Sequence, residues 1–109
     1  MPFNERLAQR VRDILVAEHS AKEKRMFGGL AFMVNGHMCC GVVNKNLVLR
    51  VGADEYKRAL LRPHARVMDF TGREMTGFVY VDPRGCGTTA SLRDWIQLSL
   101  KFVLSLPPK

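Results

Sequence analysis

Three segments of the chain show apolar residues at helical spacing. Asn4 is a good N-cap for the first segment, which predicts an amphipathic helix over residues 5–18. The second segment begins at residues 52–55 and must end by Arg62, because the proline that follows disfavours helix in the residue before it. The third begins at the Ser-Leu-Arg-Asp sequence of residues 91–94, which resembles a capping box. We therefore expect three helices, the last of them near the C-terminus.

Between these segments the sequence is almost continuously apolar and is broken by turn-forming residues. Asn35-Gly36 is the strongest signal for a hairpin, because both residues of such a tight turn need a positive φ. The charged residues 22–25 are predicted to link the first helix to the sheet. The predicted strands cover residues 26–34, 37–43, 47–51, 65–70 and 75–81. The resulting order, α-β-β-β-α-β-β-α, indicates a single α+β domain over residues 1–109, with an antiparallel sheet packed with helices.

Both faces of the predicted sheet are apolar. The tight turn pairs Val34 with His37 and Phe32 with Cys39, and alternation along the strands then divides the side chains between the faces. One face carries Leu30, Phe32, Val34, Cys39, Gly41, Val43, Leu47, Leu49 and Val51. The other carries Phe27, Ala31, Met33, Met38, Cys40, Val42, Val48 and Arg50. In the second hairpin, the same alternation places Met68, Phe70, Met75, Val79 and Val81 opposite Val67, Phe78 and Tyr80.

The second apolar face needs an explanation, because an antiparallel sheet with one wet face alternates apolar and polar residues. Two explanations stay open at this point. Either helices of the chain cover the face, or it meets another protein chain, since large exposed apolar patches usually mark interfaces. The methionines at positions 33 and 38 would suit an adaptable contact.

The net charge is +7, from 17 basic and 10 acidic residues, and arginines (11) outnumber lysines (6). This balance permits nucleic-acid binding and equally suits a solvated surface that keeps a small protein soluble. No apolar run reaches the roughly 18–20 residues that span a bilayer, and the N-terminus lacks the order of a signal peptide. Three cysteines, an odd number, argue against a disulfide framework. We expect a cytoplasmic protein without membrane association.

Two glycine motifs look like phosphate-binding sequences. Gly28-Gly29 lacks the Gly-Lys-Ser/Thr ending of a P-loop and continues into a strand, where glycine marks a bulge or a close backbone approach. Residues 85–90, GCGTTA, match a dinucleotide fingerprint, but the following parallel strand and the acidic residue about 20 positions on are missing. A weaker alternative is that the backbone N–H groups of residues 87–91 hold an anion at the start of the last helix.

The sequence offers no convincing catalytic or metal-binding set. Adjacent residues in a strand point to opposite faces, so Cys39 and Cys40 are not expected to share a metal ion. The histidines are scattered, and zinc sites need paired ligands at short spacing. His64 with Asp69 is the nearest basic-acidic pair, and it is a poor acid–base device. We therefore expect no enzymatic activity, no metal and no cofactor.

Four blocks of the sequence resemble a known family. They are RMFGGLAFMVNGHMCCGVV at residues 25–43, LVLRV at 47–51, PHARVMDFTGREMTGFVYVDP at 63–83 and SLPPK at 105–109. Together they strongly resemble the N-terminal domain of the TfoX/Sxy competence-regulator family, over essentially the whole chain.

The resemblance implies an α+β domain with an antiparallel sheet, which agrees with the order of elements above. Two-domain members regulate DNA-uptake genes together with a transcription activator, and the family motif implies no catalytic residues. This chain ends where the second domain of those regulators would begin, so we expect a stand-alone single-domain member.

Three functional hypotheses follow. The first is a small, non-enzymatic interaction domain that modulates a transcriptional or other regulatory partner, or self-associates as a homodimer. Its candidate contact residues are Phe27, Met33, Met38, Val48 and Arg50. The second is direct nucleic-acid binding through a basic surface, whose candidate residues are Arg25, Arg58, Arg62, Arg66 and Arg73. The third is a small-ligand pocket between the sheet and the last helix, near Trp95 and Cys86.

Overall fold

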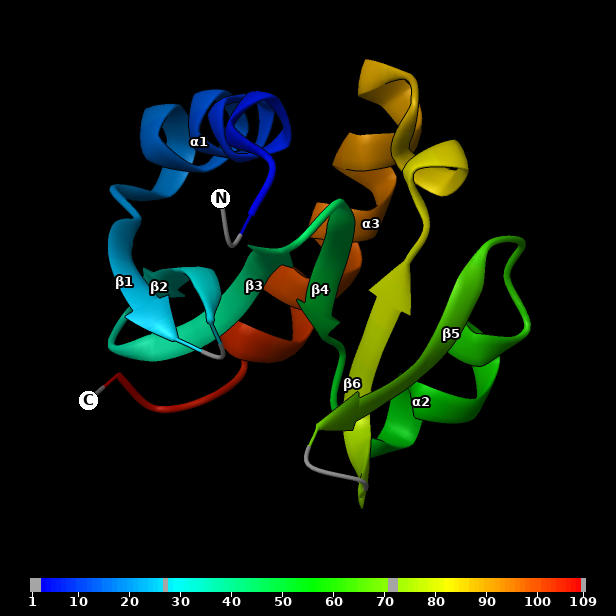
Figure 1. Cartoon of the computed structure of the whole chain (residues 1–109). Coiled ribbons are helices and arrows are strands. Elements are labelled where there is room, and N and C mark those ends of the chain that lie inside the picture. The colour runs from blue at the N-terminus through cyan, green and yellow to red at the C-terminus, as the bar shows by residue number, and fades with distance from the viewer. Residues whose placement is uncertain (1–2, 27, 71–72, 109) are drawn as a thin grey trace.

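The computed structural model describes residues 3–26, 28–70 and 73–108 of the chain (Figure 1). Within those residues, one six-stranded antiparallel sheet has the strand order β1-β2-β3-β4-β6-β5 and packs with three α-helices. The predicted α+β class is therefore confirmed. The elements are α1 (Glu5–His19), β1 (Lys22–Met26), β2 (Gly29–Val34), β3 (His37–Val43), β4 (Asn46–Arg50), α2 (Ala53–Leu60), β5 (Ala65–Phe70), β6 (Arg73–Val81), the 3-10 turn η1 (Pro83–Cys86) and α3 (Thr89–Val103).

The observed order contains one strand more than the predicted order. Residues 22–25, predicted to be a link, form most of β1 and pair with β2 at one edge of the sheet. These residues are charged and exposed. An edge strand is held by backbone hydrogen bonds on one side only, and charged side chains commonly protect it from pairing with other chains. This edge strand therefore forms without alternating apolar and polar residues, and for that reason the sequence pattern did not predict it.

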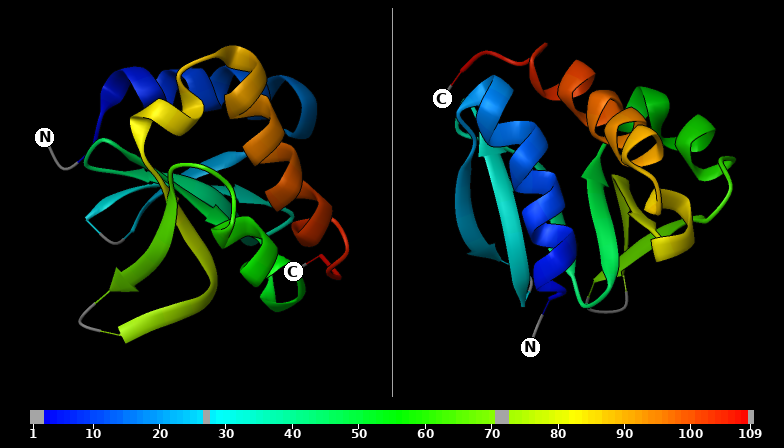
Figure 2. Two further views of the ribbon diagram at one scale, coloured as in Figure 1. Left: turned by 90° about the vertical axis from the view of Figure 1, so that its right-hand side faces the viewer. Right: turned by 90° about the horizontal axis from the view of Figure 1, so that it is seen from above.

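All three described helices pack on the same side of the sheet (Figure 2). Leu15 of α1, Tyr56 of α2 and Ile96 of α3 are buried in one cluster with Leu49 of the central strand β4. Nearly complete burial of such side chains stabilises each by roughly 1.5–3 kcal/mol relative to exposure. This cluster is the main core and joins the helices to one face of the sheet.

Helix ends agree with the sequence at α1 and differ at α3. The side-chain oxygen of Asn4 accepts a hydrogen bond from the backbone N–H of Leu7 at 2.9 Å, which confirms the predicted N-cap. At α3, the N-cap is Thr88 and Ser91 is the third helical residue, each side chain bonding the other's backbone N–H. The helix therefore starts earlier than the predicted 91–94. The sequence pattern did not reveal this start, because serine stands at the position where a capping box usually has Glu or Gln.

A β-bulge changes the predicted register of the first hairpin. Asn35 and Gly36 have positive φ, and Val34 pairs with His37, as predicted. Beyond Met33 the register shifts, so that Phe32 pairs with Cys40 rather than with Cys39. The bulge inserts an extra residue into β3 and places the remaining side chains of that strand out of phase with the predicted alternation.

The bulge reverses the prediction for the two adjacent cysteines. Cys39 and Cys40 were expected on opposite faces, but both are fully buried in the main core on the helix side. Val42 joins them there, whereas Val43 turns to the other face. The same hairpin confirms the prediction for Gly29, because a Cβ added there would collide with the carbonyl oxygen of Val42.

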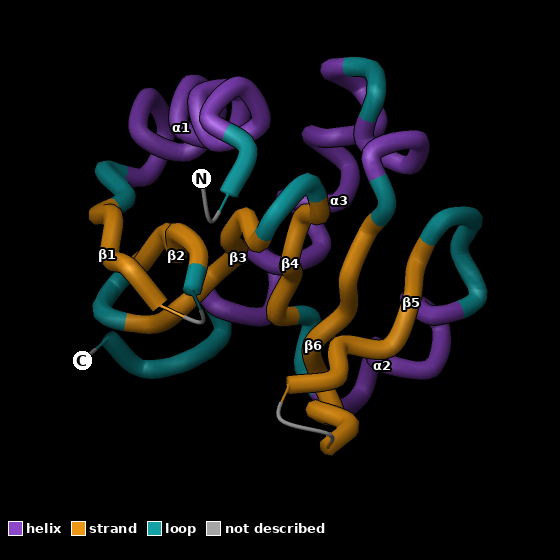
Figure 3. The backbone as a smooth tube through the Cα atoms, viewed as in Figure 1, coloured by secondary structure: helices purple, strands orange, loops and turns teal. Residues whose placement is uncertain are grey.

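The second hairpin also departs from regular alternation. The β5–β6 register shifts between Val67 and Asp69, and Gly77 in β6 has a φ of +92°. Met68 and Met75 consequently lie with Phe78 and Tyr80, not opposite them as predicted. Figure 3 shows this hairpin turning away from the plane of β1, β2 and β3, so that the sheet is strongly curved.

Candidate partner-binding face

The sheet face opposite the helices carries a second cluster of apolar side chains, which we call the methionine face. It includes every methionine in the described part of the chain, at positions 26, 33, 38, 68 and 75. Unbranched methionine side chains are flexible and polarizable, and they are over-used at adaptable binding surfaces. The full set of residues in the methionine face is Met26, Ala31, Met33, Met38, Val43, Val48, Met68, Met75, Phe78 and Tyr80.

Every described residue of this cluster comes from a strand, and the described helices contribute none. The first explanation for the second apolar face, cover by helices of the same chain, is therefore wrong for the described residues. The helices have amphipathic stripes that are already used on the other face of the sheet. Among the described residues, only strand residues form the methionine face.

The methionine face has a buried centre and a half-buried periphery. Ala31, Val48 and Met68 have at most 1% of their surface exposed. They are shielded by neighbouring side chains, because the curved sheet brings residues of β2, β4 and β5 into one contiguous cluster. Around them, Met33 and Phe78 are among the half-buried side chains that a partner could contact directly.

Positive charges surround this apolar surface. Lys22, Lys24 and Met26 occupy every second position of β1, so their side chains point to the same face of the sheet. Both lysines are exposed there. On the opposite side of the face, the Arg50 guanidinium lies 5.9 Å from the Phe78 ring centroid, and the Arg66 guanidinium lies 5.8 Å from that of Tyr80. Each of these arginines pairs across strands with the residue whose ring it approaches, and the Arg50 guanidinium lies closer still, at 5.4 Å, to the Phe102 ring centroid of α3.

A hollow of about 680 Å³ lies at the β1–β2 end of the molecule. Met33, Lys22 and Lys24 line it, together with the Asn35-Gly36 turn. The hollow therefore combines an apolar side chain of the methionine face with two of its lysines. It is large enough to receive a side chain of another molecule.

Four of the five predicted partner-contact residues belong to this region. Met33, Met38 and Val48 are members of the methionine face, and Arg50 borders it. Val48 is fully buried and supports the face from within rather than offering a surface. Phe27 lies outside the described residues. The prediction did not include Met26, Met68 and Met75, although the clustering of methionines in strand segments was a signal that could have found them.

The residues predicted to bind nucleic acid do not all lie at one place in the fold. Arg25 and Arg66 lie on β1 and β5, the opposite edges of the sheet. Arg25 lies 5.7 Å from the Phe3 ring centroid, and Arg62 lies 5.0 Å from that of Trp95. Arg58 donates to the Glu55 carboxylate at 2.7 Å. The side chain of Arg73 lies outside the described residues.

All three cysteines are buried and free. A side-chain hydrogen bond with Cys39, together with burial, raises the pKa of the Cys40 thiol well above its usual value. A thiol held neutral is a poor nucleophile and a poor metal ligand. In the parts of the chain that the structure describes, no group of three His, Cys, Asp or Glu side chains is placed to hold a metal ion.

The described helices also include none that is both long and apolar enough to cross a membrane. Fold and site together define a small α+β domain with one helix-covered sheet face and one methionine-lined face that no described helix covers. The chain belongs to the TfoX N-terminal domain family, whose match covers residues 13–103. A search of curated proteins found no match to this chain.

Proposed function

We propose that this chain is a cytoplasmic, non-enzymatic interaction domain that binds a regulatory protein partner on its methionine face. One observation carries the proposal: all described methionines lie on a sheet face that no described helix covers. Membership of the TfoX N-terminal domain family supports a regulatory setting, through the resemblance of this sequence to competence regulators.

The partner surface should be apolar and acidic. The half-buried Met33, Met75 and Phe78 would pack against apolar side chains of the partner. Lys22 and Lys24 at one side, and Arg66 at the other, would meet Asp or Glu residues that flank them. Since the exposed backbone edge of β1 is lined by charged residues, we assign the contact to the face rather than to strand addition at that edge.

The experiment uses a photo-crosslinking amino acid at position 33, in the full chain expressed in its native host. Val16 is the control position, because it is an exposed apolar residue (44% exposed) on α1, on the helix side of the sheet. We expect a crosslinked protein at position 33 that is absent at position 16. The crosslinked segment is then made as a peptide and titrated against the chain, with the methionine methyl groups observed by NMR.

The peptide should contain apolar residues flanked by Asp or Glu, and it should shift the methyl signals of Met33 and Met75. Replacing both lysines, in K22Q/K24Q, should weaken binding by about tenfold, whereas K57Q/R58Q on α2 removes the same charge and should change affinity little. Equal crosslinking at positions 16 and 33, or a peptide that leaves the methionine signals unmoved, would overturn the proposal. A crosslink to a second copy of this chain would show that the methionine face mediates self-association, and it would overturn the proposal of a different partner protein.

A further inference from the structure

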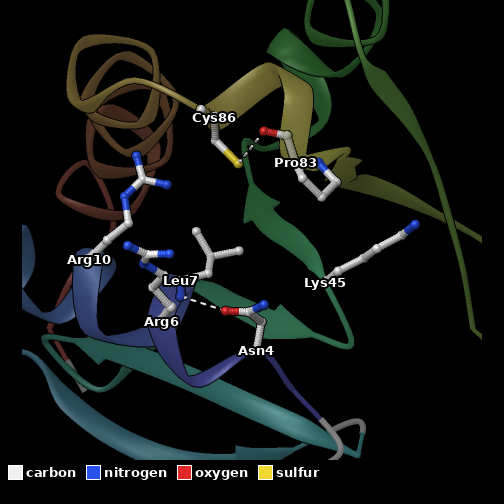
Figure 4. Close-up of a pocket in the computed structure, with 8 residues that line it drawn as sticks. Asn4, Arg6, Leu7, Arg10, Lys45, Pro83 and Cys86 are labelled. Carbon is white, nitrogen blue, oxygen red and sulfur yellow. Dashed lines mark hydrogen bonds between the residues drawn. The ribbon is translucent and has the colours of Figure 1, made fainter.

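A second feature lies on the helix side of the molecule, away from the methionine face. A pocket of about 410 Å³ opens where the N-terminal end of α1 approaches the β3–β4 turn and η1 (Figure 4). The residues that line it are Asn4, Arg6, Leu7, Arg10, Lys45, Pro83, Cys86 and Gly87. Three of these side chains are cationic, and none is a carboxylate.

The cations of this pocket come from two separate elements. Arg6 and Arg10 are one helical turn apart, so their guanidinium groups project from the same face of α1. Lys45 belongs to the β3–β4 turn on the other side of the pocket, where its long side chain is extended and exposed. The start of α1 adds the positive end of its helix dipole at the same place.

These cations differ from Arg12, Arg58 and Arg84, each of which is paired with a carboxylate. Arg12, on the same helix, is held by two hydrogen bonds to the Glu23 carboxylate, and Arg84 is paired with Asp82 at 3.4 Å. Among the described residues, Arg6, Arg10 and Lys45 form no such ion pair. Two like-charged arginines held side by side repel each other, and a bound anion would relieve that repulsion.

The remaining walls of the pocket do not supply the missing negative charge. The Cys86 thiol is buried, and its Sγ contacts the carbonyl oxygens of Asp82 and Pro83, each at 3.8 Å. Burial raises the pKa of this thiol, while the positive charge of Arg10 acts in the opposite direction. The thiol is therefore neutral near physiological pH, and Leu7 and Pro83 give the pocket an apolar side.

We propose that this pocket binds the phosphate or pyrophosphate group of a small molecule, with Arg6 and Arg10 as the principal ligands and Lys45 as a further cation at its edge. Paired guanidinium groups offer planar, two-pronged hydrogen bonding that matches phosphate oxygens, and lysine adds a mobile point charge. The volume accommodates a phosphate with a small organic group beside Leu7 and Pro83. The site is independent of the methionine face, so it stands or falls separately from the proposed function.

The test is a titration of the ¹⁵N-labelled chain with inorganic pyrophosphate, followed by NMR. We expect saturable changes at the amides of Arg6, Arg10 and Gly87, with a Kd of about 1 mM or tighter. R6Q and R10Q should each weaken binding by about tenfold or more, since each removes a charge-assisted contact. K57Q/R58Q matches the charge loss of the double variant R6Q/R10Q on a different surface, and it should keep wild-type affinity.

Three results would overturn this inference. They are shifts spread over all basic residues, equal losses in R6Q/R10Q and K57Q/R58Q, and no saturable change up to about 10 mM pyrophosphate. A short single-stranded oligonucleotide serves as the competing source of phosphate. If it binds the same amides more tightly than pyrophosphate, with a steep dependence on salt, the site contacts nucleic acid and the small-molecule assignment fails.

Discussion

Ser99 has a fully buried hydroxyl for which the described residues provide no hydrogen-bond partner. It lies in the C-terminal half of α3, on the side that packs into the main core. A buried polar atom without a partner loses its hydrogen bonds to water and regains none in the fold. The Ser99 hydroxyl therefore lowers the stability of the fold. Removing this one oxygen atom tests how α3 packs against the core.

We predict that Ser99→Ala raises the free energy of unfolding by about 1 kcal/mol, because it removes the unpartnered hydroxyl and improves helix propensity. Urea denaturation followed by circular dichroism measures the change. Ser105→Ala is the control, since that exposed hydroxyl donates to the Phe102 carbonyl at 2.5 Å, and it should gain nothing. A loss of stability in Ser99→Ala would mean that Oγ has a partner such as a buried water.

A second prediction at the residue scale concerns the ion pair between Arg12 of α1 and Glu23 of β1. The Arg12 guanidinium donates through Nε to Oε2 and through Nη2 to Oε1, the latter at 2.7 Å. These hydrogen bonds lower the pKa of Glu23, against the opposing effect of its partial burial. A carboxyl whose pKa is lower in the folded than in the unfolded state stabilises the fold above its unfolded pKa, and this contribution disappears as the pH falls.

Glu23→Gln should therefore destabilise the domain near neutral pH by a few tenths to about 1 kcal/mol, because the pair is partly exposed. The difference from the wild type should shrink as the pH falls below the unfolded-state pKa of about 4.3, and it should vanish only below the lower pKa that Glu23 has in the folded state. Thermal unfolding at a series of pH values measures both effects. Glu55→Gln removes an ion pair that lies within α2 and is expected to cost less than about 0.5 kcal/mol. A constant difference at all pH values would contradict the prediction.

At the scale of elements, strand β6 is shaped by one glycine. Gly77 has a φ of +92°, a conformation that residues with a Cβ rarely adopt. Its carbonyl oxygen accepts hydrogen bonds from the backbone N–H groups of Val51 and Gly52, at 2.8 and 3.2 Å. The irregularity at this point places Met75 and Phe78, three residues apart, on the same face of the sheet.

We predict that Gly77→Ala destabilises the domain by about 1–3 kcal/mol, through backbone strain at a positive φ. Gly87→Ala is the matched control, because Gly87 has a φ of −69° and an added Cβ would meet its nearest neighbour at an ordinary 3.7 Å. Chemical denaturation of both variants measures the difference. Equal stability of the two variants would show that β6 adopts a second conformation without strain.

The elements differ in how well their sequence reveals them. The Asn35-Gly36 turn and the Asn4 cap act within a few residues, so their chemistry is readable without knowledge of the rest of the fold. Strand β1 depends on backbone pairing with β2, and its charged side chains resemble a surface link. The bulge at Cys39–Cys40 depends on how two strands fit together, and alternation along one strand does not predict it.

At the scale of the whole molecule, the two sheet faces have different roles. The helices cover one face and build a core that includes Leu49 and Ile96. The described methionines gather on the other face, between the lysines of β1 and the arginines of β4 and β5. The cationic pocket lies apart from that face, at the start of α1. A single domain thus presents two separate surfaces, and we propose that one binds a protein and the other a small anion.

The sequence by itself determined the class of the fold, the positions of the three helices and the central hairpin, and the presence of apolar residues on both sides of the sheet. These features follow from local propensity and from the spacing of apolar residues, which act over a few positions. The apolar pattern on both sides of the sheet also predicted Met33, Met38 and Arg50 as contact residues, and the structure places them in or beside the methionine face.

Only the tertiary structure decided which face the helices cover, where the bulges fall, and that Arg6, Arg10 and Lys45 line one pocket. Each of these depends on contacts between residues that are distant in the sequence. A one-residue bulge moves every following side chain to the other face, so a strand pattern that is apolar on both sides leaves the choice of face to packing.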